Sequence, residues 1–199
     1  MADTDFKAIA ARQRAAIEEL YRSLKQADFG FEKPREAFLP PSPDTEKILQ
    51  RFAANGCPLP EAVAEFYRQI GGVNFIGWSS DWDDDEYPDA LNVDTLELLL
   101  ENFEECYLED RAAMDEAYGG FYLSFCPDFL HKQDISGGEA YGFVLPTKDA
   151  DPKVNGIPWD FRFTEYIDFA IENGGFPGIG FWRYRIGGDS ARDDEDERR

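Results

Sequence analysis

The hydrophobic residues at the start of the chain recur every three or four positions, which predicts a long amphipathic helix. Phe6 opens this pattern and Leu24 ends it, so the helix is expected over about residues 4–27, with Thr4 as its cap. The next segment, 28–43, is rich in Phe and Pro without any periodicity, and we expect it to be irregular.

Two shorter helices are predicted next, over residues 44–54 and from Pro60 to about residue 70. Asn55-Gly56 ends the first helix and Gly71-Gly72 ends the second. The residues expected to face the core are Ile48, Leu49, Phe52, Val63, Phe66, Tyr67 and Ile70.

Runs of β-branched and aromatic residues predict strands at 73–78, 90–93, 121–125, 140–145 and 160–163. A long helix is expected over 94–118, capped by Asp94 or Thr95, and a last helix over 164–173. The core-facing residues expected on the long helix are Leu96, Leu99, Leu100, Phe103, Cys106 and Met114.

Strands and helices are grouped along the chain rather than strictly alternating. This order predicts an α+β fold with a central, largely antiparallel sheet, helices packed on it and a long N-terminal helix. We expect a single domain over residues 1–186 and a disordered charged tail over 187–199. No internal repeat and no boundary of a second domain is evident.

The composition is that of a folded and strongly acidic protein. The 199 residues include 20 Lys+Arg and 41 Asp+Glu, a net charge of −21, and 43% are hydrophobic, which is enough for a core. Such a charge repels phosphate backbones and anionic membranes, so neither nucleic acid nor a membrane is an expected partner. Three cysteines without CxxC spacing and an acidic N-terminus without a secretory pattern favour the cytoplasm.

The negative charge is concentrated in the middle of the chain. Residues 1–68 carry a net charge of −1, residues 69–110 carry −13 without a single Lys or Arg, and residues 111–199 carry −7. The densest part runs from Asp81 to Asp89. The ordinary interpretation of such a run is a solvated loop.

The sequence contains no convincing set of catalytic or metal-binding residues. Cys126 and the only histidine, His131, are the residue types of a nucleophilic pair, but Cys126 follows an apolar strand and is interpreted as a buried structural thiol. Asp128, His131 and Asp134 carry metal-ligand chemistry without the spacing of a metal motif. We expect no resident metal and no cofactor.

The acidic run partly matches the pattern of a calcium-binding loop. Asp81, Asp83 and Asp85 match the first ligands of an EF-hand, but Glu86 replaces the turn glycine and Asn92 replaces the final glutamate, so an EF-hand is rejected. Adventitious binding of a divalent cation remains open. A glycan hydrolase based on paired carboxylates also remains open, although no pair stands out among so many acids.

Four ordered segments give the chain a resemblance to the SUKH superfamily, which includes Smi/Knr-type cell-wall-synthesis regulators and many bacterial immunity proteins. They are Leu59-Pro60-Glu61 through Gly71-Gly72-Val73; Cys126-Pro127-Asp128 with Gly137-Gly138; Tyr141 to Pro146; and Phe163 to Tyr166 with Gly174-Gly175-Phe176-Pro177-Gly178. Gly71 stands where the family usually has Asn.

This resemblance implies an α+β fold, no catalysis and no cofactor. It also implies that the motif residues maintain the fold rather than select a partner. These residues are Pro60, Gly71, Gly72, Pro127, Asp128, Gly137, Gly138, Tyr141, Pro146, Tyr166, Gly174, Gly175, Phe176, Pro177 and Gly178.

The function expected from the resemblance is that of an immunity protein that binds and neutralises a toxin. Nuclease toxins are basic because they grip phosphates, so the acidic run is the leading partner-binding candidate. Its residues are Asp81, Trp82, Asp83, Asp84, Asp85, Glu86, Tyr87 and Asp89. The alternatives are a regulatory or scaffold protein of the Smi/Knr type and, less favoured, the glycan hydrolase. The sequence does not define the oligomeric state.

Overall fold

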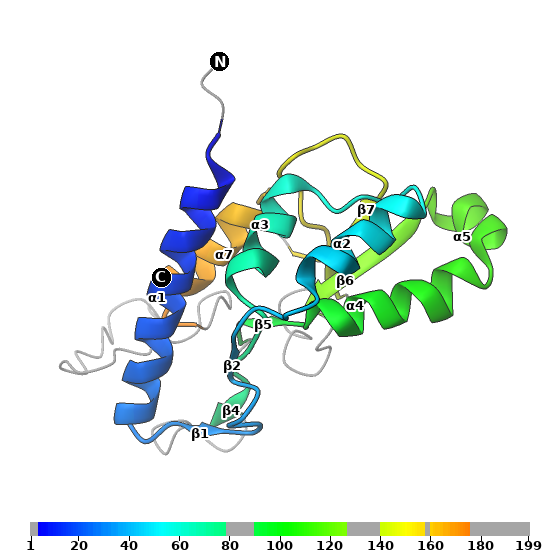
Figure 1. Cartoon of the computed structure of the whole chain (residues 1–199). Helices are drawn as coiled ribbons and strands as arrows, with labels where there is room; N and C mark the ends of the chain where they lie inside the picture. The colour runs from blue at the N-terminus through cyan, green and yellow to red at the C-terminus, as the bar shows by residue number, and fades with distance from the viewer. Residues whose placement is uncertain (1–3, 79–89, 127–139, 158–159, 176–199) are drawn as a thin grey trace, which may run out of the picture.

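The computed structural model describes residues 4–78, 90–126, 140–157 and 160–175. Its longest element is the N-terminal helix α1 (Phe6–Gln26), which stands along one side of the molecule (Figure 1). The cap of α1 is Asp5 and not the predicted Thr4, because an Asp5 carboxylate oxygen accepts a hydrogen bond from the Ala8 N–H at 2.9 Å.

The buried face of α1 packs against α3 (Glu61–Gln69) and α7 (Phe163–Glu172). One buried polar residue, Gln13, joins α1 to α7: its Nε2 donates to the Thr164 carbonyl oxygen at 3.1 Å and to Asp168 at 3.0 Å. These bonds satisfy an amide that would otherwise be costly to bury.

The helix α2 (Thr45–Ala54) lies beside α3, as the apolar spacing of both segments predicts. The predicted core-facing residues of both helices are buried. Arg68 of α3 donates to both carboxylate oxygens of Glu46 in α2, at 2.6 and 3.1 Å, and ties the two helices together at the surface.

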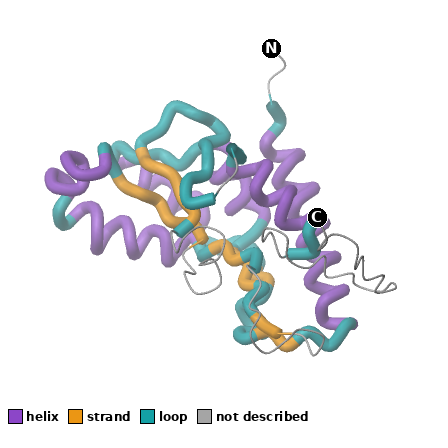
Figure 2. The backbone as a smooth tube through the Cα atoms, turned by 180° about the vertical axis from the view of Figure 1, so that it is seen from behind, coloured by secondary structure: helices purple, strands orange, loops and turns teal. Residues whose placement is uncertain are grey.

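All the described strand pairs are antiparallel, and they form three small sheets. The first pairs β1 (Gly30–Phe31) with β4 (Gly77–Trp78); the second has the order β2 (Phe38–Leu39), β3 (Gly72–Asn74), β5 (Asn92–Val93); and the third pairs β6 (Phe121–Cys126) with β7 (Tyr141–Leu145). The Asp94 N–H donates to the Phe125 carbonyl at 2.9 Å and links the second sheet to the third. The strands follow one another through the middle of the molecule, with helices on either side (Figure 2).

The predicted α+β class and the largely antiparallel strands are therefore confirmed, with three linked sheets in place of one continuous sheet. The strand predicted over 73–78 is divided between two of these sheets. Phe75 donates its N–H to the Leu91 carbonyl at 3.0 Å, whereas the next residue, Ile76, accepts from Glu32 at 2.9 Å. The chain changes sheets at this point.

The C-terminal predictions need two corrections. No strand forms over 160–163 in the described residues: Arg162 makes a single bridge with Lys153. The last helix begins at Phe163 and not at Thr164, whose hydroxyl donates to Asp151 at 2.5 Å.

The helix predicted over 94–118 is divided into three parts: α4 (Leu96–Asn102), the π-helix η1 (Phe103–Leu108) and α5 (Arg111–Tyr118). Thr95 is the cap, and its Oγ1 accepts from the Leu98 N–H at 3.3 Å. The prediction that Cys106 faces the core is wrong. A π-turn holds more residues than an α-turn, so Tyr107 becomes buried while Cys106 is exposed.

Aromatic side chains fill much of the core. The Phe125 ring lies 5.2 Å from that of Phe163 and 5.9 Å from that of Tyr166, and Tyr141 meets Tyr166 edge to face at 5.4 Å. These contacts bring β6, β7 and α7 together. Among the helices of the described segments, none is both long and apolar enough to cross a lipid bilayer.

Candidate protein-binding surface

The predicted partner-binding residues, from Asp81 to Asp89, lie outside the described residues, but the strands on either side of them are described. Trp78 ends β4 and pairs with Gly30. On the other side, the N–H of the buried residue Leu91 donates to the Gly175 carbonyl at 2.7 Å. The acidic segment therefore connects the first sheet to the second.

The described structure continues the acidic block beyond this segment. Six of the 13 acidic residues between 69 and 110 fall at 81–89, and the other seven are Asp94, Glu97, Glu101, Glu104, Glu105, Glu109 and Asp110. Leu99, Leu100 and Phe103 face the core, which leaves the opposite side of α4 and η1 to the carboxylates.

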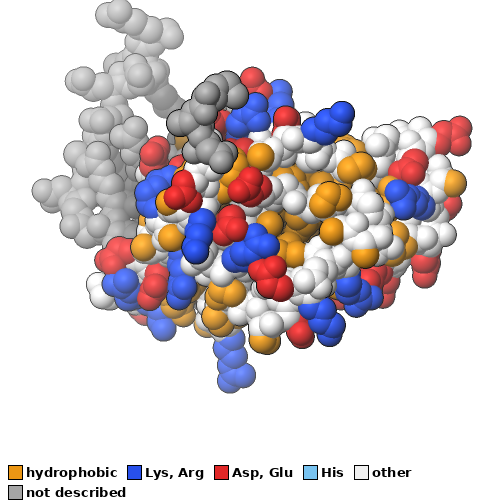
Figure 3. Space-filling view, turned by 45° about the horizontal axis from the view of Figure 1, so that its top comes forward, with side chains coloured by type: hydrophobic (Ala, Val, Ile, Leu, Met, Phe, Trp, Pro, Cys, Tyr) orange, Lys and Arg blue, Asp and Glu red, His pale blue; other side chains and the backbone are white. Residues whose placement is uncertain are grey.

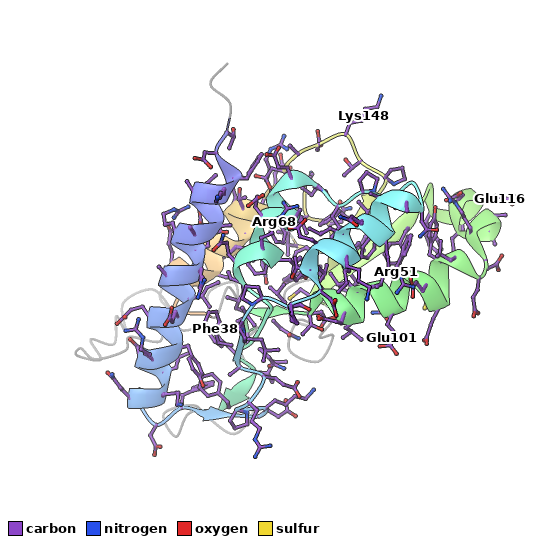
Figure 4. All side chains as sticks on the ribbon, in the orientation of Figure 1. Phe38, Arg51, Arg68, Glu101, Glu116 and Lys148 are labelled. Atoms are coloured by element: carbon purple, nitrogen blue, oxygen red, sulfur yellow. The ribbon has the colours of Figure 1, made fainter. Side chains whose placement is uncertain are left out.

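Glu97, Glu101 and Glu105 form what we term the acidic stripe, with a spacing of four residues along the exposed side of α4 and η1. Figure 4 shows Glu101 pointing away from the body of the protein. The neighbouring Glu104 instead pairs with Arg51 of α2. The three stripe residues form no ion pair with any residue that the structure describes.

This arrangement differs from that of acids that pair with bases. The surface drawn in Figure 3 shows Lys and Arg side chains interspersed with Asp and Glu. Ion pairs such as Arg68–Glu46 belong to such mixed surface. The acidic stripe is therefore a local excess of charge that no described base pairs with, as expected from a block without Lys or Arg.

Next to the stripe, a groove of about 610 Å³ lies over one face of the second sheet. The register pairs Asn74 of β3 with Asn92 of β5 and Gly72 with Leu39 of β2, so these side chains share a face. We term this hollow the sheet groove. Its lining includes Glu32, Lys33, Glu36, Asn74, Ile76, Asn92, Asp94 and Leu98.

The two asparagines on the floor of the sheet groove differ in their bonding. The side-chain oxygen of Asn74 accepts from the Ile76 N–H at 3.1 Å. Asn92 is only 8% exposed, and its side-chain amide makes no hydrogen bond with a described residue. Asn92 is not among the described residues whose polar atoms are both fully buried and without a partner, so its amide reaches solvent through the sheet groove and is accessible to a ligand there.

A second cluster of polar groups, around Cys57, stabilises the fold and does not form a reactive site. The Tyr107 hydroxyl donates to Asp115 at 2.6 Å, and the Arg111 guanidinium lies over the Tyr107 ring at 5.5 Å. Burial raises the pKa of the Cys57 thiol, which keeps it protonated and unreactive. The cluster holds α5 against the turn after α2.

The thiol of Cys126 is buried, as expected, 3.7 Å from the Tyr166 hydroxyl. Its considered partner His131, and the considered metal ligands Asp128 and Asp134, lie outside the described residues. Within the described segments, no group of three or more His, Cys, Asp or Glu side chains is arranged to hold a metal ion.

The described motif residues lie at turns and in the core. Pro60 directly precedes α3, Gly71 precedes β3 and Gly72 begins it, and the Leu145–Pro146 peptide bond is cis. Tyr141 and Tyr166 are buried, and Gly174 and Gly175 adopt positive φ after α7. Pro127, Asp128, Gly137, Gly138, Phe176, Pro177 and Gly178 lie outside the described residues.

Sequence reasoning missed the sheet groove. The available signal was a polar residue inside a short apolar run, as in Val73-Asn74-Phe75 and Leu91-Asn92-Val93. Such an asparagine is unusual because strands disfavour this residue type. That Asn74 and Asn92 face each other depends on pairing across the sheet, which the local sequence does not show.

Comparison with known proteins adds no assignment: no protein-family model matches the chain, and no curated protein or solved structure is significantly similar to it.

Proposed function

We propose that this protein is a non-catalytic binding module for a basic protein, of the kind that neutralises a bacterial toxin. The observation that carries the proposal is the acidic stripe, Glu97, Glu101 and Glu105, exposed and unpaired among the described residues. The resemblance of the motifs to the SUKH superfamily supports the toxin-neutralising role.

The physical basis is electrostatic complementarity. A toxin that cleaves nucleic acid needs a basic surface to hold phosphates. A protein with a coherent acidic surface is steered towards that basic surface at long range, which raises the association rate. Because the same surface would otherwise hold nucleic acid, the bound inhibitor excludes the substrate.

The first test is co-expression with each basic toxin encoded beside the gene. We expect the protein to restore growth against one of them, and failure against every adjacent toxin contradicts the immunity role. Recovery of housekeeping proteins instead, by affinity capture from the native lysate, favours the scaffold alternative.

The second test uses the neutralised toxin and a charge-reversed stripe, Glu97→Lys with Glu101→Lys and Glu105→Lys. We expect association to slow by about tenfold or more at low salt, since charges at the edge of an interface mainly set the on-rate. Stopped-flow mixing over a range of ionic strength measures this effect, and the wild-type rate should fall as salt increases.

The matched control reverses three exposed acids outside the block: Glu116→Lys, Asp149→Lys and Glu172→Lys. Both variants change the net charge by +6. If the two variants slow association equally, total charge rather than the stripe drives binding, and the stripe has no specific role.

A further inference from the structure

The sheet groove is lined by two amides and by carboxylates, of which those of Glu32 and Glu36 are exposed. Asn74 and Asn92 face each other across β3 and β5, and Glu32, Glu36 and Asp94 line the same hollow. The described lining contains one base, Lys33, whose ammonium lies 3.7 Å from Glu36. The groove therefore favours a cation.

Asn92 provides an independent indication of a ligand. Its side chain is more than nine-tenths buried and lines the groove, yet it makes no hydrogen bond with a described residue. A ligand donor placed in the groove would satisfy the amide oxygen, and the low exposure of the site would strengthen that bond.

The chemistry of the lining selects among cations. The carboxylate oxygens and the amide oxygen of the groove accept hydrogen bonds from several directions. A guanidinium has five N–H donors in one plane and can bond to several of these acceptors at once. An ammonium is a compact, strongly hydrated charge that loses more water on entry. Ile76 and Leu98 add apolar surface beside the polar groups, which suits the aliphatic part of an arginine side chain.

The groove is continuous with the surface proposed above. Asp94 and Leu98 line it at the start of α4, and Leu98 is 40% exposed directly after Glu97 of the acidic stripe. A basic partner drawn to the stripe is thereby brought to the groove.

We infer that the sheet groove receives an arginine side chain of the basic protein partner, an assignment that rests on the proposed function. The stripe attracts the partner, and the groove recognises one of its residues. Glu32 and Glu36 bind the guanidinium together with the amide of Asn92.

The test uses the full chain and the peptide acetyl-Gly-Arg-Arg-Gly-amide, with Lys and citrulline versions for comparison. Backbone NMR signals of Asn74 and Asn92 should shift with the Arg peptide, less with Lys and not with citrulline. The variant Glu32→Gln with Glu36→Gln should weaken Arg-peptide binding by about tenfold, since each charge-assisted bond is strong.

The matched control is Glu97→Gln with Glu101→Gln and Glu105→Gln, which removes more charge from the stripe but none from the groove. We expect it to leave Arg-peptide affinity within about twofold, because exposed charges at this range are screened. Equal loss in both variants, or no shift at Asn74 and Asn92, overturns the assignment.

The variant Asn92→Leu tests the amide itself. It should lose Arg-peptide binding while melting at a temperature no lower than the wild type; unchanged peptide affinity overturns the role of Asn92. Failure of the groove is distinguishable from failure of the function, because reversal of the stripe can still slow toxin association when the peptide does not bind.

Discussion

Gly71 has no room for a side chain because of Pro40: a Cβ atom added at Gly71 would lie 1.8 Å from the Pro40 carbonyl oxygen. The neighbouring backbone is fixed by the Gly71 N–H, which donates to the Leu39 carbonyl at 2.9 Å. The close approach of β2 to the end of α3 therefore requires glycine at this position for steric reasons.

Gly71→Ala should lower the free energy of unfolding by about 2–4 kcal/mol, the range of severe overpacking. Urea denaturation followed by circular dichroism measures the loss. The control is Gly119→Ala, where nothing lies within 4 Å and only the positive φ of 74° opposes a side chain. It should cost about 1 kcal/mol, and an equal loss in the two variants would contradict the steric argument.

Tyr107→Phe should destabilise the protein by about 1 kcal/mol, since it removes one partly buried hydrogen bond to Asp115 while keeping the ring. Chemical denaturation at pH 7 measures this change. Tyr118→Phe is the matched control: Tyr118 lies in α5, the helix of Asp115, and is 63% exposed, so its variant should be as stable as the wild type.

The same tyrosine predicts an alkaline effect. Burial, together with the bond to Asp115, raises the pKa of Tyr107 to about 12. In the unfolded chain the phenol ionises near pH 10, so the folded state holds its proton more tightly. The stability advantage of the wild type over Tyr107→Phe should be complete below pH 10 and decline from pH 10 to 12. A stability difference that stays constant from pH 10 to 12 would contradict the raised pKa of Tyr107.

Arg68→Met should cost about 1 kcal/mol at pH 7, because it removes the exposed pair with Glu46 and a second pair, at 2.7 Å, with the less exposed Glu65. Hydrogen bonds from Arg68 hold the pKa of Glu46 below its ordinary value. The contribution of Glu46 is therefore present above its unfolded pKa and lost as the pH falls through the lower folded value.

Measuring the unfolding of Arg68→Met from pH 7 to pH 2 checks this sign: its deficit relative to the wild type should shrink with acid. Arg14→Met, at an exposed position of α1 with no ion pair to a described residue, should show no deficit at any pH. A deficit that grows towards pH 2 would refute the argument.

Asn92→Leu should leave the free protein about as stable as the wild type, because the amide makes no hydrogen bond with a described residue that the change would break. The thermal midpoint is the measurement, and Asn102→Leu, at an exposed position of α4, should change it little. A lower midpoint for Asn92→Leu would mean that the amide already stabilises the fold.

Sequence periodicity was sufficient for the elements whose stability depends on neighbours along the chain. The bounds of α1, α2 and α3 agree with prediction within a few residues because their apolar stripes are regular. The division of 94–118 at η1 was not predictable in this way, since Tyr107 is buried by contacts with Phe103 and Phe121.

The candidate surface likewise has one part that the local sequence predicts and one part that it does not. The acidic stripe follows from the spacing of Glu97, Glu101 and Glu105, which any helix places on one side. The sheet groove depends on strands β2, β3 and β5, which come from distant parts of the chain and meet only in the folded protein. Pairing at such sequence distance leaves no local signal.

The spacing of the acidic stripe also has a consequence for the free protein. Carboxylates four residues apart on a helix repel each other, and each such pair costs about 0.2–0.5 kcal/mol. The last turn of α4 contains no basic residue to offset the helix dipole. Repulsion among its own carboxylates thus destabilises the α4–η1 helix. A cation that binds along it, whether from salt or from a partner, reduces this repulsion and stabilises the helix.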